Sequence, residues 1–184
     1  FDPIGQSRGG PGVVIELGPS ADGEFKVGDK VFGQALVLNG GSGAFAQMCS
    51  SNVANTSLKP KSVDFLQSAS LPLVGASAIQ ALEEHIKLKS KQKILIHGGA
   101  GGIGHIAVQL AKYLGAYVAA TVSSNDMKFV RSLGVDEVID YKTQKFEDRL
   151  HDFDAVFDTV GGDATEKSFK VLKKGGIIVS MLGQ

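Results

Sequence analysis

The clearest pattern in the chain is a stripe of apolar residues at helical spacing, directly after a short apolar strand at 94–96. The stripe consists of Ile103, Ile106, Ala107, Leu110, Ala111 and Leu114. This spacing places all of them on one face of an amphipathic helix. Gly115 predicts the end of that helix, because glycine readily adopts the left-handed conformation that follows a helix.

Strands and helices continue to alternate towards the C-terminal end. We expect strands at 117–122, 138–139, 155–157 and 177–179, and helices at 126–133 and 164–172. Alternation at this spacing predicts an α/β fold with a mostly parallel sheet and helices on both faces. No helix follows the last expected strand, so we expect an incomplete sheet.

The first third of the chain has a different pattern, in which short β-like pieces lie between glycine-rich turns. The expected strands are at 13–15, 25–27, 30–32 and 44–48, with a turn at Gly28-Asp29 and a loop at 39–43. Such a pattern is typical of a β-barrel or β-sandwich, but there is too little of it here to form a closed structure.

A connector joins these two parts. Residues 60–73 contain an expected short helix at 64–69 and a break at Pro72. Apolar residues at helical spacing then predict a helix at 74–87. The expected domains are therefore 1–72, a partial β-domain with its connector, and 73–184, the α/β domain.

The strongest local motif lies between the strand at 94–96 and its helix. It reads Gly99-Ala100-Gly101-Gly102-Ile103-Gly104 and fits G-x-G-x-x-G, a weak signal alone in a chain with 24 glycines. Its context is more specific, because the dinucleotide fingerprint also follows a strand and opens a helix. Glycines let the backbone approach a pyrophosphate, which the helix amides near 102–104 would face. The alternative is a strand-to-helix connector without a ligand.

The end of the second expected strand indicates which dinucleotide is bound. In an NAD site, an acidic side chain about 20 residues beyond the turn bonds the ribose 2′-hydroxyl. Here Ser123 and Ser124 follow the strand, and no carboxylate occurs before Asp126. Hydroxyl groups together with Lys128 favour the 2′-phosphate of NADPH, which a carboxylate would repel. The alternatives are a serine that only caps the helix, with Lys128 in solvent, and NADH bound through Asp126.

Composition narrows the function classes. Lys+Arg and Asp+Glu are both 19, so the net charge of zero does not favour binding to nucleic acid or an acidic membrane surface. No apolar run approaches the roughly 20 residues of a membrane span. We expect the lone cysteine, Cys49, to be a small buried residue, and the lack of disulfides suits a cytoplasmic compartment. The chain begins at Phe1 rather than Met, as a fragment would.

Four segments together resemble the medium-chain dehydrogenase/reductase superfamily, in its zinc-free quinone oxidoreductase (ζ-crystallin-like) branch. They are 25–33, 69–75 with 80–82, 97–104, and 133–136 with 138–141. The resemblance spans most of residues 25–183 and implies a GroES-like β-barrel domain joined to a Rossmann NADP-binding domain. Family members are longer, which implies that early barrel strands, the last Rossmann strand and a returning C-terminal segment are absent here.

The resemblance also implies roles for single residues. Lys128 and Tyr141 would approach the 2′-phosphate of NADPH, although the stretch between them is shorter than is usual in the family. Val160 and Leu182, in loops at the ends of the fourth and fifth strands, would line the cofactor groove. Ser77 would lie near the nicotinamide. The family further implies a homodimer, often formed through the edge of the Rossmann sheet.

A catalytic metal is not expected. Where zinc-dependent relatives have Gly-His-Glu, this chain has Gly5-Gln6-Ser7, and where they bring a cysteine it has Leu71-Pro72-Leu73. The four histidines, His85, His97, His105 and His151, are not paired at metal-ligand spacing. For His97, at a strand tip beside the glycine-rich turn, we expect a structural or cofactor-positioning role.

The leading hypothesis is an NADPH-dependent oxidoreductase that transfers a hydride to a small molecule, either a quinone or an α,β-unsaturated carbonyl, without zinc. NADPH would supply the hydride, and the protein would supply orientation and electrostatics. No catalytic residue is assigned, because no Ser-His-Asp or Cys-His constellation stands out. The alternatives are an NADPH-binding structural or regulatory protein of the crystallin kind, and a zinc-free alcohol or enoyl-thioester oxidoreductase.

Overall fold

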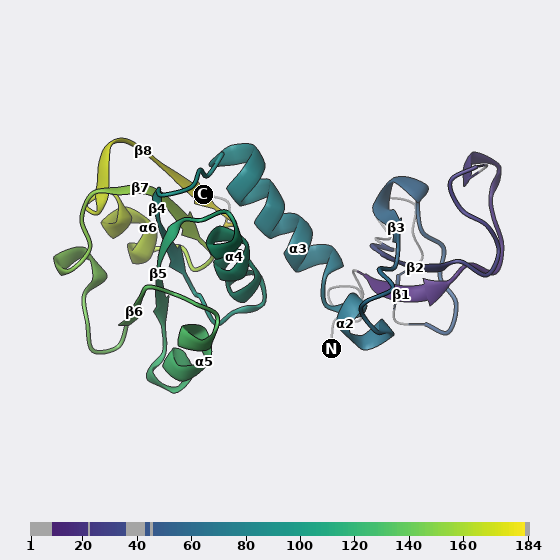
Figure 1. The fold of residues 1–184 in the computed structure, drawn as a ribbon, viewed down its shortest axis with the longest axis horizontal. Helices are drawn as coiled ribbons and strands as arrows, with labels where there is room; N and C mark the ends of the chain where they lie inside the picture. Colours follow the sequence, from purple (N-terminus) through teal and green to yellow (C-terminus); the bar gives the residue numbers. More distant parts are fainter. Residues whose placement is uncertain (1–8, 22, 36–42, 45, 183–184) are drawn as a thin grey trace. The chain divides into compact units, whose positions relative to one another are not determined.

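The computed structural model describes residues 9–21, 23–35, 43–44 and 46–182, and the chain folds into two units, Phe1–Ala76 and Ser77–Gln184 (Figure 1). The observed boundary and the expected one after residue 72 both fall within helix α3 (Pro72–Ile79). Every residue that the sequence assigns to a cofactor lies in the second unit, so this unit carries the candidate site.

Five parallel strands form the sheet of the second unit, in the order β6-β5-β4-β7-β8. They are β4 (Lys93–His97), β5 (Tyr117–Val122), β6 (Glu137–Asp140), β7 (Phe153–Asp158) and β8 (Leu172–Ser180). The strand order reverses between β4 and β7, in the centre of the sheet. Open α/β sheets bind ligands at the carboxyl ends of their strands beside such a switch point.

Helices cover both faces of this sheet, as the alternating pattern predicts. Figure 1 shows α4 (Gly102–Tyr113) and α5 (Met127–Ser132) on one side and α6 (Asp163–Ser168) on the other. Side chains of β4 alternate accordingly: Ile94 and Ile96 belong to the core under α4, and Leu95 belongs to the core on the opposite face. Short 3₁₀ turns complete the unit, η5 (Ser124–Asp126) and η6 (Phe146–Asp148). Among the described helices, none is long and apolar enough to cross a membrane.

The helix expected at 164–172 is shorter than the sequence predicts. It ends at Ser168, because Leu172 already pairs with Phe153 as the first residue of β8. The register then shifts before Ala155 pairs with Ile177. Strand pairing therefore overrides the helical spacing of these residues.

The connector forms two helices, and the second changes character along its length. Asp64 caps α2 (Phe65–Ala69) in a capping box with Gln67, which confirms the short helix expected here. Pro72 is the first residue of α3, where its missing N–H needs no partner, so it starts a helix as well as ending the previous one. The helix expected at 74–87 is α-helical only to Ile79 and continues as a π-helix, η4 (Gln80–His85).

The first unit contains a small antiparallel sheet in the order β1-β2-β3. The strands are β1 (Gly10–Val13), β2 (Lys30–Gly33) and β3 (Thr56–Leu58), with 3₁₀ turns η1 (Pro19–Ala21) and η3 (Val53–Asn55). The strands expected at 25–27 and, in its described residues, at 44–48 are wrong, and β3 was missed. Apolar runs this short have no periodicity that distinguishes a strand from a loop. Whether such a run forms a strand therefore depends on the presence of a pairing partner. Residues 5–7, 39–42 and 45 lie outside the described residues.

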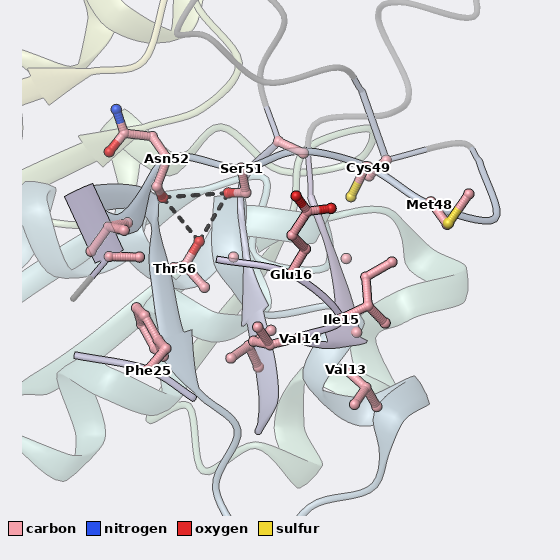
Figure 2. Close-up of a pocket in the computed structure, with 18 of the residues that line it drawn as sticks. Val13, Val14, Ile15, Glu16, Phe25, Met48, Cys49, Ser51, Asn52 and Thr56 are labelled. Carbon is pink, nitrogen blue, oxygen red and sulfur yellow. Dashed lines mark hydrogen bonds between the residues drawn. The ribbon is translucent and has the colours of Figure 1, made fainter. Parts of the chain in front are cut away.

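A cavity of about 540 Å³ lies in this first unit. Figure 2 shows Val14, Ile15 and Phe25 among its lining residues, near a hydrogen-bonded cluster in which the Ser51 and Thr56 hydroxyls lie 2.9 Å apart. Cys49 also lines it and is exposed, so the expectation that this cysteine is buried is wrong. The cavity contains none of the residues that the sequence assigns to a cofactor.

A buried histidine supports the end of β4. His97 is 1% exposed, with Nδ1 3.0 Å from Thr121 Oγ1 on β5 and Nε2 2.8 Å from Ser168 Oγ on α6. Since the Ser168 hydroxyl donates to the Ala164 carbonyl, it must accept from Nε2–H. Nδ1 of the neutral ring then accepts from Thr121, whose oxygen in turn accepts from the Gly98 amide. The network links two strands, a helix and the glycine-rich turn.

Burial lowers the pKa of His97 to about 4, although the negative charges of Asp158 and Glu147 act in the opposite direction. The ring therefore stays neutral in the folded protein at neutral pH. A proton on Nδ1 would remove the acceptor that Thr121 needs. Below about pH 6.5 the His97 ring binds a proton in the unfolded chain but stays neutral in the folded protein. The free energy of unfolding therefore decreases as the pH falls from about 6.5 to about 4.

We expect the substitution His97→Gln to flatten the acid limb of the stability profile. Wild type should lose up to about 3 kcal/mol more unfolding free energy than the variant between neutral pH and pH 4, because glutamine does not titrate. Denaturant unfolding of both proteins at a series of pH values measures this difference, in which effects of the shared carboxylates cancel. Parallel profiles would contradict the prediction.

Candidate functional site

The glycine-rich segment forms a tight turn from β4 into α4. Gly98 has φ of 69°, a conformation that side chains rarely adopt. Its carbonyl accepts from the Gly101 amide at 2.9 Å, and the Gly99 amide donates to the Thr121 carbonyl at 3.0 Å. The turn is therefore closed on itself and held against the end of β5.

Close packing explains why two of its positions are glycine. A Cβ on Gly104 would lie 2.1 Å from the Gly98 carbonyl oxygen, and a Cβ on Gly99 would lie 2.8 Å from Cβ of Ala120. No side chain fits at either place without moving backbone or core atoms. At Gly101 the nearest contact would be 3.2 Å, to the same carbonyl oxygen. The first and third glycines of the motif thus serve packing. The middle one is exposed, although a Cβ there would also touch the turn.

The start of α4 has the properties of an anion-binding site. Gly101 is the N-cap, and no side chain caps the helix. The amides of Gly102, Ile103 and Gly104 have no carbonyl one turn earlier in the helix to bond. The aligned peptide dipoles add partial positive charge at this end of a 12-residue helix. A phosphate bound here would satisfy donors that the protein itself leaves uncapped.

The ends of β7 and β8 continue the site on one side of the turn. Thr159 Oγ1 donates to the His97 carbonyl at 2.8 Å, which holds the loop after β7 against the end of β4. The Val160 side chain is 55% exposed and lies beside Gly98, where an added Cβ would be 3.2 Å from Val160 Cγ2. Leu182, 48% exposed, packs against Gly161. Val160 and Leu182 therefore lie at the same edge of the sheet as the turn.

The end of β5 continues the site on the other side, with a charge distribution that the sequence does not reveal. Ser123 Oγ donates to Asp126 at 2.6 Å, and Ser124 Oγ donates to Asp140 at 2.5 Å. Asp140 ends β6, and hydrogen bonds from Ser124 and the Lys142 amide lower its pKa. Both serine hydroxyls are thus engaged by carboxylates, and Asp140 is a second negative group that sequence spacing did not place here.

Lys128 and Tyr141 are exposed at this same end. Lys128 is the second residue of α5, and its ammonium group has no hydrogen bond or ion pair with the residues that the structure describes. Tyr141 directly follows β6, is 58% exposed, and its amide donates to the Val122 carbonyl at 3.1 Å. Both side chains are free to meet a ligand at the β5 and β6 ends. Ser77, by contrast, is buried in α3.

Three residues of the site were missed by sequence reasoning. Thr121, near the end of β5, accepts from the Gly98 amide of the turn, and Asp140, at the end of β6, accepts from Ser124. Asp158, at the end of β7, binds the loop that carries Val160. The available signal was a polar side chain as the last or nearly last residue of an otherwise apolar strand. That signal is weak without knowledge of which strands are neighbours.

The chain is similar to known oxidoreductases. A family model described as zinc-binding dehydrogenase matches residues 102–181. A 2-methylene-furan-3-one reductase of Solanum lycopersicum is 39% identical over 178 residues, which cover 94% of this chain and 45% of that protein. A chloroplastic NADPH-dependent alkenal/one oxidoreductase of Arabidopsis thaliana is 38% identical over 178 residues, again 94% of this chain and 45% of that protein.

A solved structure agrees with these relatives. The quinone oxidoreductase from Coxiella burnetii has 37% sequence identity and a TM-score of 0.81, and the match covers 94% of this chain and 54% of that one. The chain thus spans about half the length of the relatives it matches. The parallel sheet, the glycine-rich turn and these similarities support the resemblance of the chain to the medium-chain dehydrogenase/reductase superfamily, in its quinone oxidoreductase branch.

Proposed function

We propose that this chain binds NADPH and forms part of an oxidoreductase that reduces a quinone or an α,β-unsaturated carbonyl compound without catalytic zinc. The observation that carries the proposal is the uncapped start of α4 beside the switch point of the sheet. The relatives' names, which include an NADPH-dependent alkenal/one oxidoreductase and a quinone oxidoreductase, support the same cofactor and substrate class.

The residues of the second unit fit a dinucleotide. The pyrophosphate would be held by the segment Gly99–Gly104, in which Gly101 and Gly102 are exposed. The adenosine 2′-phosphate would be held by the β5 and β6 ends, through Lys128 and Tyr141 with Ser123 and Ser124. Val160 and Leu182 would line the groove towards the nicotinamide, and we retain Ser77 as a proposed neighbour of that ring.

Within this assignment the chain's own residues bind and orient, and NADPH when bound supplies the hydride. The α4 amides would hold the phosphates, and this fixes the long axis of the cofactor along the carboxyl edge of the sheet. The apolar side chains of Val160 and Leu182 would exclude water from the groove that they line. The proposal assigns no residue to polarise the substrate carbonyl.

The zinc-free character stays a prediction from the sequence. Leu71-Pro72-Leu73 stands where zinc-dependent relatives bring a cysteine. Within the described part of the chain, no three His, Cys, Asp or Glu residues gather in a way that could hold a metal ion. The homodimer and the cytoplasmic compartment stay predictions from the sequence.

We expect the chain to oxidise NADPH when a quinone or an enone is supplied. A panel of quinones, alkenals and an enoyl thioester, followed by NADPH absorbance, tests the reaction and ranks the substrate classes. Turnover confined to the thioester would favour the enoyl-thioester alternative. Tight NADPH binding without turnover on any substrate would favour the structural, crystallin-like alternative.

Gly101→Ala should weaken NADPH binding by roughly tenfold or more, because its methyl group would crowd the exposed turn that the pyrophosphate approaches. A small loss of thermal stability is expected as well, since the added Cβ would lie 3.2 Å from the Gly98 carbonyl oxygen. The backbone at this position has φ of −70°, which alanine tolerates. Fluorescence titration with NADPH and thermal unfolding measure the two effects. Gly75→Ala, in α3 with nothing within 4 Å of an added Cβ, is the matched control and should bind normally. Equal affinity of both variants and wild type would contradict the assignment.

Lys128→Ala should weaken NADPH by roughly 1.5–3 kcal/mol, on the order of 10- to 100-fold, and leave NADH nearly unchanged. The reason is loss of a charge-assisted bond to the 2′-phosphate, which NADH lacks. Arg131→Ala removes a charge one turn later on the same helix and serves as the control. Titration of each variant with both cofactors measures the difference. Equal weakening of NADPH and NADH would reject this role for Lys128.

A further inference from the structure

The loop between β7 and α6 is built around a buried carboxylate. Asp158 is the last residue of β7, is 0% exposed, and pairs in register with His97 of β4. It therefore lies at the topological switch point, between the end of β4 and the loop that carries Val160. Neither the fold nor the glycine motif requires a carboxylate at this place, and a buried charge is costly unless donors surround it.

Three donors surround it. Asp158 Oδ1 accepts from the amides of Val160 at 2.8 Å and Gly161 at 2.9 Å, and Oδ2 accepts from the Thr165 hydroxyl on α6. Burial acts to raise the pKa of Asp158, but these hydrogen bonds outweigh it and hold the pKa below its usual value. The carboxylate is therefore ionised at neutral pH, and its charge draws the loop inwards.

The loop needs such a restraint. Gly161 and Gly162 have φ of 80° and 61°, and two successive glycines give the backbone wide conformational freedom. The Asp158 bonds fix the residue before this pair and the first member of it. They place the Val160 side chain beside Gly98 of the turn and Gly161 beneath Leu182. The same bonds engage the Val160 and Gly161 amides, so these two donors face Asp158.

We propose that Asp158 is a positioning residue for the nicotinamide end of the cofactor. It acts through the Val160 and Gly161 amides, which it holds so that Val160 forms a firm wall of the groove beside the phosphate turn. This inference rests on the proposed NADPH function. Its consequence is that loosening the loop should impair the hydride-transfer step more than it impairs cofactor affinity, since the phosphate-binding amides of α4 are untouched.

Asp158→Ala tests the inference, with Asp158→Asn as the conservative variant. Asparagine Oδ1 can still accept from both amides, and its NH₂ group can donate to the Thr165 oxygen, so it should restore much of what alanine loses. In the ligand-free protein, hydrogen exchange of the Val160 and Gly161 amides should become faster in the alanine variant and much less so in the asparagine variant. Thr165→Val, which removes only the third donor, covers the case in which Asp158→Ala does not fold.

With NADPH and the best quinone or enone, kcat should fall roughly 10- to 100-fold in Asp158→Ala, and the Kd for NADPH should change only a few-fold. With stereospecifically deuterated NADPH, transfer from a single face in wild type should become mixed in this variant. If Asp158 served only the stability of the fold, the variant would keep both the face of hydride transfer and the ratio of kcat to the Kd for NADPH.

Asp154→Ala is the matched control, because Asp154 lies at the opposite end of the same strand. It accepts from the Lys93 amide at 2.8 Å, from Gln92 at 3.3 Å and from Lys173. This variant should lose stability and keep kcat. Faster exchange at Val160 and Gly161 with unchanged kcat and stereochemistry would overturn the inference alone. Unchanged exchange would overturn it as well. Failure of wild type to bind NADPH would overturn the proposed function and the inference together.

Discussion

The contact between the first turn of α4 and the carbonyl of Gly98 is the constraint on which the site depends. An added Cβ at Gly104 would lie 2.1 Å from that oxygen, so helix and turn meet backbone to backbone. This closeness brings the uncapped amides of α4 to the carboxyl edge of the sheet. The same geometry accounts for a helix that begins without a side-chain cap, since a capping side chain would occupy the place of a bound anion.

Buried polar groups beneath this contact make it rigid. His97 and Thr121 form a chain of hydrogen bonds from the Gly98 amide into the core, and Asp158 organises the loop on the other side of the switch point. Each group has donors or acceptors to match it, and within the described residues no buried side-chain nitrogen or oxygen lacks a partner. Buried polar networks cost little only when they are fully satisfied, and they then specify one arrangement. Here that arrangement is the path of the glycine-rich turn and of the loop after β7.

At the end of β5, negatively charged side chains oppose the proposed preference for NADPH. Asp126 and Asp140 accept from Ser123 and Ser124, so two carboxylates lie near the proposed 2′-phosphate position. Lys128 and Lys142 are both exposed near this end, and neither ammonium group forms an ion pair with the described residues. Discrimination between NADPH and NADH would therefore depend on a balance between the exposed ammonium groups of Lys128 and Lys142 and the two engaged carboxylates. The sequence pattern alone suggested a simpler, more positive site.

The order of strands and helices in the second unit follows from the sequence by itself, because helical and strand periodicities are local properties of the chain. The apolar stripe of α4, the glycine after it and the G-x-G-x-x-G turn needed no tertiary information. The ends of α6, the π-helix after Ile79 and the strand β3 were decided by pairing and packing with distant segments. The same holds for the partners of the site: Ser168 reaches His97 across 71 residues of sequence, and Asp140 reaches Ser124 only because β6 lies beside β5. Hydrogen-bond partners brought together by folding leave no periodic trace in the chain, so only the tertiary structure could show which polar residues hold the groove.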